Sequence, residues 1–423
     1  MTSTVGFQTR ARTIDHLGRG QIADAPTAIS ELWKNAYDAY ATNVSLHVFD
    51  GAPEVGAIFD DGFGMDRTDL INRWLIIGTE SKIEEEGAAP PETFGLPVRQ
   101  RQGEKGIGRL SAAFLGPSTV LISKKAGAPF VSVVVDWRLF ENPFIALEDV
   151  LLPIGEYPDV EELIAGIAEA GGAIRSNLGG SKDDRDWRLK LGWDRFSDYE
   201  RRHGVAQTTA EAIEAAWDSF PLDRRHLSEW PVFLGLVDHG TAMLLPWVNH
   251  ELAVWVRPDA TGPEVDEVKE RLRETLTGFT DPYADPRPAF DYEVFVHRRT
   301  TSVRVLAASD VFGLEGLRAL EHHVEGSFDE RGVFRGQVTA FDRDLGIKEY
   351  VPRRPPPTRG RERLGPFALC VGTFEVDERR STHSETHDFI VVGQLRSTNA
   401  NRLLQLMGQH LSRIGMEFFD MPK

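Results

Sequence analysis

Residues 24–42 carry the pattern of an amphipathic helix. Asp24 is a favourable N-cap residue, and Pro26 suits the first helical turn. The apolar positions recur at spacings of three and four, so they fall on one face and predict a helix that packs onto a core. These positions are Ile29, Leu32, Trp33, Ala36 and Tyr40.

Alternating or continuous apolar runs follow this helix and predict strands. Residues 67–77 predict a further helix, and residues 155–230 are mostly helical and charged, which indicates an insertion. The expected strands lie at 43–49, 55–60, 118–125 and 129–137, with another within 230–247.

Residues 83–102 show no periodicity and contain three prolines and two glycines. Long segments of this kind within compact domains are often lids over a site. We therefore expect a lid over about residues 80–108.

The composition shifts near residue 280, which predicts a domain boundary. Residues 1–280 would form the first domain and residues 281–423 a smaller second domain. Strands are expected at 290–297, 301–308, 332–341 and 366–374, and a closing helix at 398–414. Helices and strands together predict an α+β fold in both domains.

The charge balance narrows the classes of function. Acids outnumber bases 65 to 48, for a net charge of −17, which argues against wrapping nucleic acid over the whole surface. The single cysteine, Cys370, lies in an apolar run and is expected in the core. Neither a signal segment nor a run of membrane-spanning length is present, so we expect a soluble, cytoplasmic protein with no membrane partner.

The sequence DDGFGM, residues 60–65, ends the second expected strand. A carboxylate there can accept a hydrogen bond from an exocyclic amine, and Gly62 and Gly64 leave room for a flat ring. Asp60 with Gly62 and Gly64 therefore suits a purine slot. A tight acidic turn is the alternative, because Asp and Gly dominate turns.

The polar face of the first helix carries Glu31, Asn35 and Asp38 at positions i, i+4 and i+7. An amide can ligate Mg²⁺, and a carboxylate can position water as a general base. A solvated polar face is the alternative interpretation.

A glycine-rich stretch, GEKGIG, precedes another short helix. Glycines at a helix start let backbone N–H groups approach a phosphate, although a lid hinge would use the same residues. Lys82 could neutralise phosphate charge, and Thr241, at the start of a strand, could bond a water or a base. The residues of the stretch are Gly103, Lys105, Gly106, Ile107 and Gly108.

In this order, ELWKNAYDA, DDGFGM, GTESK, GEKGIG and HGT together resemble the GHKL superfamily of DNA gyrase B, heat-shock chaperone ATPases, histidine kinases and MutL. Within it, the sequence is similar to stand-alone bacterial ATP-binding proteins and the MORC-like group. The resemblance covers about residues 7–250 without the helical insertion. It implies a Bergerat-type sandwich that binds ATP and Mg²⁺.

The resemblance also implies roles for single residues. Glu31 matches the acid that activates water, Asn35 the Mg²⁺ ligand, and Asp60 the adenine-reading aspartate. Asp61 stands where the family often has asparagine. The remaining nucleotide-binding positions implied are Asp38, Gly62, Gly64, Met65, Lys82, Gly103, Lys105, Gly106, Ile107, Gly108 and Thr241.

The second domain resembles a transducer module in its architecture. In such modules a lysine often reaches the γ-phosphate, and Lys348 is the candidate; a plain surface lysine is the alternative. The resemblance implies an ATPase that uses lid closure and homodimerisation as a switch, with a role in DNA maintenance or phage defence.

Two other classes of function stay open. One is an ATP-gated nucleic-acid clamp or chaperone-like scaffold, with or without an effector protein, for which the basic stretch 353–363 is a candidate contact. The other is a sensor-type histidine kinase, for which only His16 lies upstream of the motifs as a phosphoacceptor.

Overall fold

The computed structural model describes residues 6, 8–77, 93–99, 102, 108–256, 270–271, 275–276, 279, 289–310, 313–320, 322–340, 343–352 and 366–373. The chain forms two compact units. The first comprises residues 1–280 and 289–310, and the second comprises residues 281–288 and 311–423.

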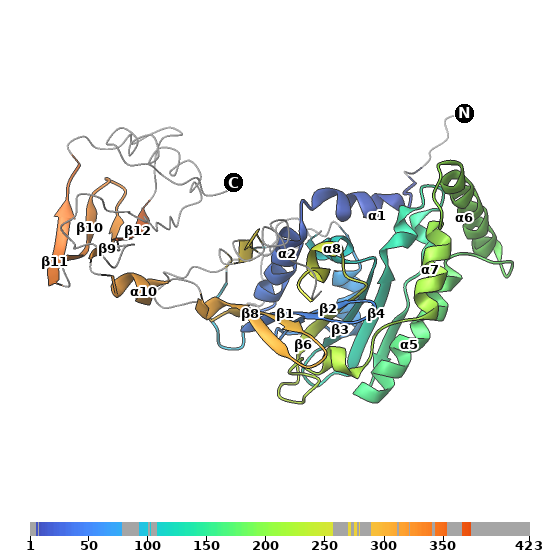
Figure 1. The fold of residues 1–423 in the computed structure, drawn as a ribbon, viewed down its shortest axis with the longest axis horizontal. Coiled ribbons are helices and arrows are strands. Elements are labelled where there is room, and N and C mark those ends of the chain that lie inside the picture. The colour runs from blue at the N-terminus through green and yellow to red at the C-terminus, as the bar shows by residue number, and fades with distance from the viewer. Residues whose placement is uncertain are drawn as a thin grey trace. The chain divides into compact units, whose positions relative to one another are not determined.

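The first unit is built on a mixed eight-stranded sheet with the strand order β5-β4-β3-β6-β2-β1-β7-β8 (Figure 1). Neighbouring strands are antiparallel except for β1 and β7, which are parallel. The strands are β1 (Asn43–Phe49), β2 (Val55–Asp60), β3 (Ser118–Lys124), β4 (Phe130–Asp136), β5 (Ile154–Tyr157), β6 (Gly240–Pro246), β7 (Asp291–His297) and β8 (Ser302–Ala307).

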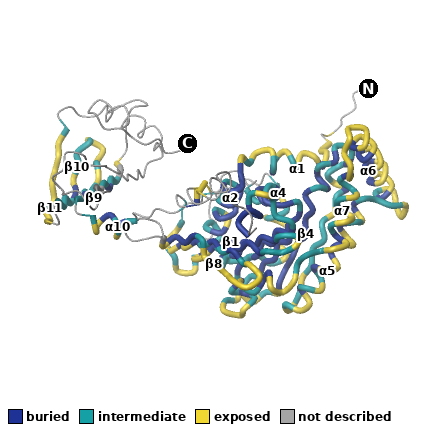
Figure 2. Tube along the Cα trace, in the orientation of Figure 1, coloured by how far each residue is buried: buried dark blue, intermediate teal, exposed yellow. Residues whose placement is uncertain are grey.

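Helix α2 (Ala25–Asp38) packs its apolar side into the core of this unit. Its N-cap, Asp24, accepts a hydrogen bond from the Thr27 N–H at 2.9 Å. Trp33 is fully buried and its ring lies 5.1 Å from that of Tyr292 on β7. The central strands and this face of α2 are the darkest part of Figure 2, so the core lies directly beneath the helix.

The other side of β1 and β7 carries stacked rings. His47 is paired with Phe295 across the two strands, with ring centroids 5.0 Å apart. Nδ1 of His47 lies 2.8 Å from Nε2 of His297, and its Nε2 lies 2.9 Å from Ser45 Oγ. Burial, and to a smaller extent the neighbouring His297, lowers the pKa of His47 to about 3.

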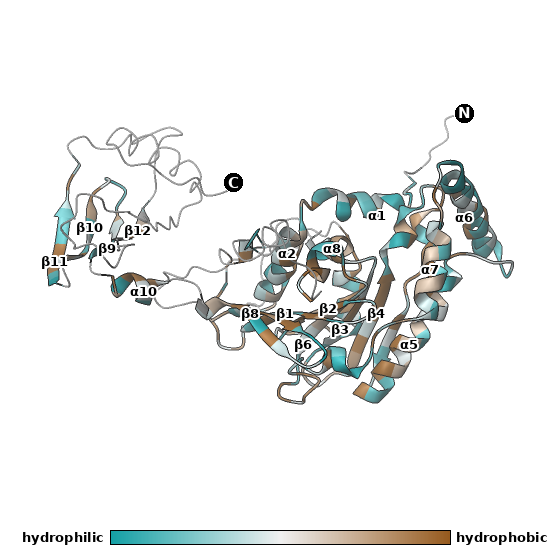
Figure 3. Cartoon of the chain, viewed as in Figure 1, coloured by the Kyte–Doolittle hydropathy of each residue, from teal (hydrophilic) through white to brown (hydrophobic). Residues whose placement is uncertain are grey.

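Helices α5 (Val160–Ser176), α6 (Asp184–Arg202) and α7 (Thr209–Asp218) occupy the segment in which we expect a helical insertion. Helix α5 contacts β4 and β5, and α7 contacts α5 and α6. Figure 3 shows α6 as largely hydrophilic beside the hydrophobic central strands, which fits a helix at the surface.

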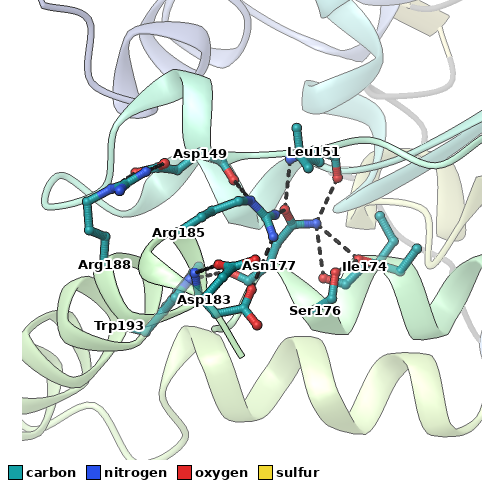
Figure 4. A network of polar contacts seen from close by, with 11 residues as sticks. Asp149, Leu151, Ile174, Ser176, Asn177, Asp183, Arg185, Arg188 and Trp193 are labelled. Atoms are coloured by element: carbon teal, nitrogen blue, oxygen red, sulfur yellow. Dashed lines mark hydrogen bonds and ion pairs between the residues drawn. The ribbon is translucent and has the colours of Figure 1, made fainter. Parts of the chain in front are cut away.

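The buried side chain of Asn177 links this helical insertion to the preceding segment of the chain (Figure 4). Asn177 exchanges hydrogen bonds of 2.8 and 2.9 Å with the backbone of Leu151, and its carbonyl accepts from Trp193 Nε1 at 2.9 Å. Arg185 binds the Asp149 carbonyl and the Asn177 amide oxygen, each at 2.9 Å. Each buried polar group in this network has a partner, so the contacts stabilise the helices rather than offer a site.

Short helices connect these elements. They are α1 (Arg12–Leu17), η1 (Arg19–Gln21), α3 (Arg67–Asp69), η2 (Leu70–Trp74), η3 (Gly108–Ser111), α4 (Ala112–Leu115), η4 (Trp137–Glu141), η5 (Leu147–Asp149), η6 (Arg224–Leu227), α8 (His250–Ala253) and η7 (Ala308–Asp310). The helix expected at 67–77 is shorter, because after one α-helical turn the chain widens into the π-helix η2 and ends at Trp74.

The second unit has an antiparallel four-stranded sheet with the order β11-β10-β9-β12. Cys370 on β12 is buried with Leu314 and Leu317 of α10, as expected for a core residue. The elements are α10 (Leu314–Arg318), β9 (His322–Phe328), β10 (Phe334–Ala340), β11 (Arg343–Tyr350) and β12 (Phe367–Thr373).

The mixed α+β class expected from the sequence is confirmed by the two sheets. Strands β7 and β8 differ from the expected arrangement, because they pair with β1 and extend the sheet of the first unit. The expected boundary at residue 281 would place them in the second domain. The expected closing helix at 398–414 lies outside the described residues.

Candidate functional site

Helix α2 presents the three polar residues singled out in the sequence. Glu31 Oε1 lies 2.6 Å from Lys34 Nζ. Asn35 is exposed, and Asp38 Oδ1 accepts a hydrogen bond from the Gln102 N–H at 2.9 Å. Asp38 therefore fixes the chain at the end of the lid segment, while Glu31 and Asn35 remain one helical turn apart.

Asp60 ends β2 and lies next to Thr241 of β6 in the sheet register. Its Oδ1 accepts a hydrogen bond from the Gly62 N–H at 2.9 Å. Burial, together with the adjacent Asp61, raises the pKa of this carboxyl to about 7. The hydrogen bond from the Gly62 N–H lowers the pKa but does not cancel this effect. A carboxyl with such a shifted pKa at the end of a strand is typical of a functional site.

The two glycines of DDGFGM allow a close chain crossing. A Cβ on Gly62 would lie 2.9 Å from the Ala39 carbonyl oxygen, at the end of α2. Gly64 has a φ of +65°, and a Cβ there would lie 1.9 Å from the Lys124 carbonyl oxygen. A side chain at either position would collide with these carbonyl groups. The two glycines therefore allow the DDGFGM loop to pass between the end of α2 and the end of β3.

Asp61 has a structural task. Its Oδ1 accepts hydrogen bonds from the N–H groups of Thr42 and Asn43 at 2.7 and 2.8 Å, and its Oδ2 accepts from the Thr42 hydroxyl at 2.5 Å. An acceptor at this position closes the turn between α2 and β1, which explains why aspartate serves here.

A buried hydroxyl joins the remaining parts of the pocket. Ser123 Oγ accepts from the Met65 N–H at 2.8 Å and lies 3.1 Å from Thr241 Oγ1 and 3.2 Å from the Gly240 carbonyl oxygen. The sequence analysis did not identify Ser123. A hydroxyl directly after the apolar run 120–122 of this strand was the available signal.

Three rings stand beside the DDGFGM loop. Phe94 lies 4.5 Å from Phe63 and 4.5 Å from His239 between ring centroids, and the second pair is stacked. His239 Nδ1 lies 2.9 Å from the Gly62 carbonyl oxygen. Phe63 belongs to DDGFGM and His239 to HGT, but their contacts with Phe94 were not predicted, because the three residues lie far apart in the chain.

Gly108 begins η3 and faces Glu31. A Cβ on Gly108 would lie 3.1 Å from Glu31 Oε2, so this glycine brings the chain close to the carboxylate. The other expected phosphate-binding residues, Lys82, Gly103, Lys105, Gly106 and Ile107, lie outside the described residues.

Lys348 lies within β11 of the second unit and is exposed, whereas the sequence suggested a position between two strands. Its suggested role at a γ-phosphate stays a prediction.

Residues 24–144 match the family model described as "Histidine kinase-, DNA gyrase B-, and HSP90-like ATPase". This region is similar to GHKL-type ATPase domains. The match contains α2, the DDGFGM loop and Gly108, which are the elements that form the pocket described above.

The GHKL-type domain is also similar to DNA mismatch repair proteins MutL. It is 34% identical over 84 residues to MutL of Anaeromyxobacter sp. (strain K), which is 20% of this chain and 14% of that protein. It is 30% identical over 59 residues to MutL of Endomicrobium trichonymphae, which is 14% of this chain and 10% of that protein. The matched segments are thus a small part of these relatives' length.

A solved structure described as the N-terminal domain of a DNA repair protein is also similar. The match has 14% sequence identity and a TM-score of 0.35, and it covers 78% of this chain and 70% of the other.

ATPases of this superfamily bind ATP with Mg²⁺, and Asp60 and Asn35 carry the kinds of side chain that can contact a base amine and Mg²⁺. A Cβ at Gly62 or Gly64 would meet the backbone of Ala39 or Lys124, so the two glycines allow the chain to pass close by beside Asp60. The described residues hold no group of three or more His, Cys, Asp or Glu side chains that could bind a metal. Mg²⁺ commonly takes one or two protein ligands together with phosphate and water oxygens. Asn35 offers such a ligand.

None of the described helices is both long and apolar enough to cross a membrane.

Proposed function

We propose that this protein is a Mg²⁺-dependent ATPase in which ATP binding and hydrolysis switch the conformation of the chain. The proposal rests on one observation: two segments that are far apart in the chain, at Gly62 and at Gly108, both lie close to α2. Glu31 meets Gly108 on one side, and Ala39 meets Gly62 on another. In this proposal Glu31 is the acid, Asp60 is the carboxyl that reads the base, and Gly108 belongs to the phosphate-binding turn.

Each residue has a defined task in this proposal. Asp60 accepts a hydrogen bond from the exocyclic amine of adenine, and Gly62 and Gly64 leave room for the ring. Asn35 ligates Mg²⁺, which when bound neutralises charge on the phosphates. Glu31 orients a water molecule and takes its proton as the water oxygen attacks the γ-phosphorus and ADP leaves.

ATP hydrolysis by wild type, Glu31→Ala and Glu31→Gln tests this proposal. We expect kcat to fall at least about 100-fold in both variants, because a general base contributes about 10²- to 10⁴-fold. Affinity for a non-hydrolysable ATP analogue should stay unchanged. Glu169→Gln on the exposed side of α5 is the matched control. Equal hydrolysis by wild type and Glu31→Gln would remove Glu31 from the mechanism.

The same assay separates ATPase from kinase. His16 lies exposed on α1 and is the candidate phosphoacceptor of a sensor kinase. With γ-labelled ATP, we expect free phosphate and an unlabelled protein. Label that stays on wild type but not on His16→Ala would favour the kinase.

A role in DNA maintenance is the second proposal, because the similar proteins are named as DNA mismatch repair proteins. The expected result is DNA binding that strengthens with an ATP analogue and falls steeply with salt. Replacement of the arginines in 353–363, which lie outside the described residues, should weaken it. Salt-independent or absent DNA binding would leave phage defence or a partner effector protein as the roles to test.

A further inference from the structure

Lys34 forms a close ion pair with Glu31 on α2. Its Nζ lies 2.6 Å from Glu31 Oε1, and the two side chains are only 30% and 31% exposed. An ordinary surface pair of this chain, Lys190 with Asp194 on α6, is longer at 3.1 Å and more exposed, at 47% and 62%. The Lys34 pair therefore differs from the solvated pairs that contribute little to stability.

The two oxygens of Glu31 have different surroundings. Oε1 is bound by the ammonium of Lys34, whereas Oε2 faces Gly108, whose missing side chain leaves the approach open. Helix α2 packs against η3, so both sides of the carboxylate are fixed by secondary structure. One oxygen is held, and the other is presented to the proposed phosphate-binding turn.

A general base works when a lone pair points at the proton to be removed, and bases are commonly oriented by a third group. A lysine ammonium has three donors and no acceptor, so it can hold a carboxylate but cannot itself take a proton. The residue types and the geometry thus assign complementary tasks to Glu31 and Lys34.

We propose that Lys34 is a positioning residue for the reaction: it holds Glu31 Oε1 so that Oε2 faces the attacking water beside Gly108. This rests on the proposed ATPase function. The water oxygen forms a bond to the γ-phosphorus, the bond from that phosphorus to the ADP oxygen breaks, and the water proton passes to Glu31 Oε2. Lys34 keeps its protons throughout.

The test uses the full chain with Lys34→Met, which keeps an apolar stem without the charge, and Lys34→Arg, which keeps the charge. We expect Lys34→Met to lower kcat about tenfold, less than loss of the base itself, with KM and the affinity for an ATP analogue unchanged. Lys34→Arg should recover most of the activity. In a Glu31→Gln background, Lys34→Met should cause no further loss, because the two residues act as one unit.

Lys190→Met is the matched control and should hydrolyse ATP like wild type. Wild-type kcat in Lys34→Met, or a raised KM with kcat unchanged, would overturn the role of Lys34. The ATPase proposal would then still stand on the loss of hydrolysis in Glu31→Gln. Absence of hydrolysis in wild type itself would overturn both.

Discussion

At the scale of single residues, Asp60 links the chemistry of the pocket to pH. Its pKa is raised from 3.8 to about 7, mainly by burial, so the carboxyl is mostly protonated below neutral pH. A base amine is a donor, and it bonds more strongly to the carboxylate than to the neutral carboxyl. Nucleotide binding should therefore compete with protonation of Asp60.

We expect affinity for an ATP analogue to fall by up to about tenfold per pH unit below pH 7 and to level off above it. Titration calorimetry from pH 5.5 to 8, with excess Mg²⁺ to keep the phosphates ionised, measures this. Proton release on binding near pH 6, seen as a dependence on buffer ionisation enthalpy, is the accompanying sign. An affinity that is flat across this range would show that Asp60 does not read the base.

The site residues that the sequence predicts are those whose chemistry is local. Glu31 and Asn35 share a helix face by spacing alone, and Gly62 and Gly64 stand out beside Asp60. Ser123 could not be assigned, because its partner Thr241 lies 118 residues away and meets it only through the pairing of β3 with β6. Phe94 and His239 are likewise far apart in the sequence, and their rings stack only because the fold brings the two segments together.

At the scale of elements, Arg99 anchors residues 93–99 to the C-terminal end of α2. Its Nη1 donates to the carbonyl oxygens of Tyr37 and Ala41 at 2.9 and 2.8 Å, and its guanidinium lies 4.6 Å from the centre of the Tyr37 ring. Positive charge at the C-terminal end of a helix also complements the helix dipole.

We expect Arg99→Met to destabilise this anchoring by about 1.5–3 kcal/mol, the range for hydrogen bonds to charged groups. Hydrogen exchange at residues 93–99 should quicken, while the strands of the sheet keep their protection. Arg195→Met, which removes a guanidinium that lies 4.1 Å from the Phe144 ring on the surface, is the control. Unchanged exchange at residues 93–99 would mean that Arg99 is not the anchor.

The stacked rings of β1 and β7 predict how the first unit responds to acid. The pKa of His47 is lowered from 6.5 to about 3, so the unfolded chain takes up a proton there in a pH range where the folded chain does not. This contribution to stability is present above pH 6.5 and is lost as pH falls from 6.5 to about 3. Burial likewise lowers the pKa of His226 to about 4, despite the neighbouring Asp223, and that of His297 despite Glu229.

Replacement of His47 by Phe keeps the stacking and removes the titrating group. Between pH 4 and 6, we expect the slope of the unfolding free energy against pH to fall by up to about 1.4 kcal/mol per unit. Urea unfolding at several pH values measures it, with the exposed His16→Phe as control. An unaltered slope would show that His47 also titrates normally in the folded chain.

Elements formed by local patterns were predictable, and their long-range pairing was not. Helix α2 and strands β1 and β2 follow from spacing and alternation over a few residues. Strand β7 was expected as a strand, but its parallel pairing with β1 joins residues about 250 positions apart, such as Asn43 and Asp291. No local pattern encodes that choice, so the strand was assigned to the second domain.

At the scale of the whole molecule, the question is whether nucleotide changes the association of the chain. The net charge of −17 opposes self-association through mutual repulsion, and salt screens this repulsion. The contact surfaces of a dimer must therefore contribute enough free energy to offset this repulsion. Such a dimer should form more readily at moderate ionic strength than in dilute buffer.

Light scattering with three proteins tests nucleotide-dependent dimerisation. With a non-hydrolysable ATP analogue and Mg²⁺ at about 0.15 M salt, wild type should move from monomer to dimer mass. Asp60→Asn, which loses the proposed base acceptor, should stay monomeric. Glu31→Gln, which should bind ATP without hydrolysing it, should remain dimeric with ATP itself, whereas wild type returns to monomer as ATP is consumed.

A monomer mass for wild type with saturating analogue would reject the dimer, because binding would then occur without association. A persistent wild-type dimer after complete hydrolysis would show instead that association does not depend on the nucleotide state.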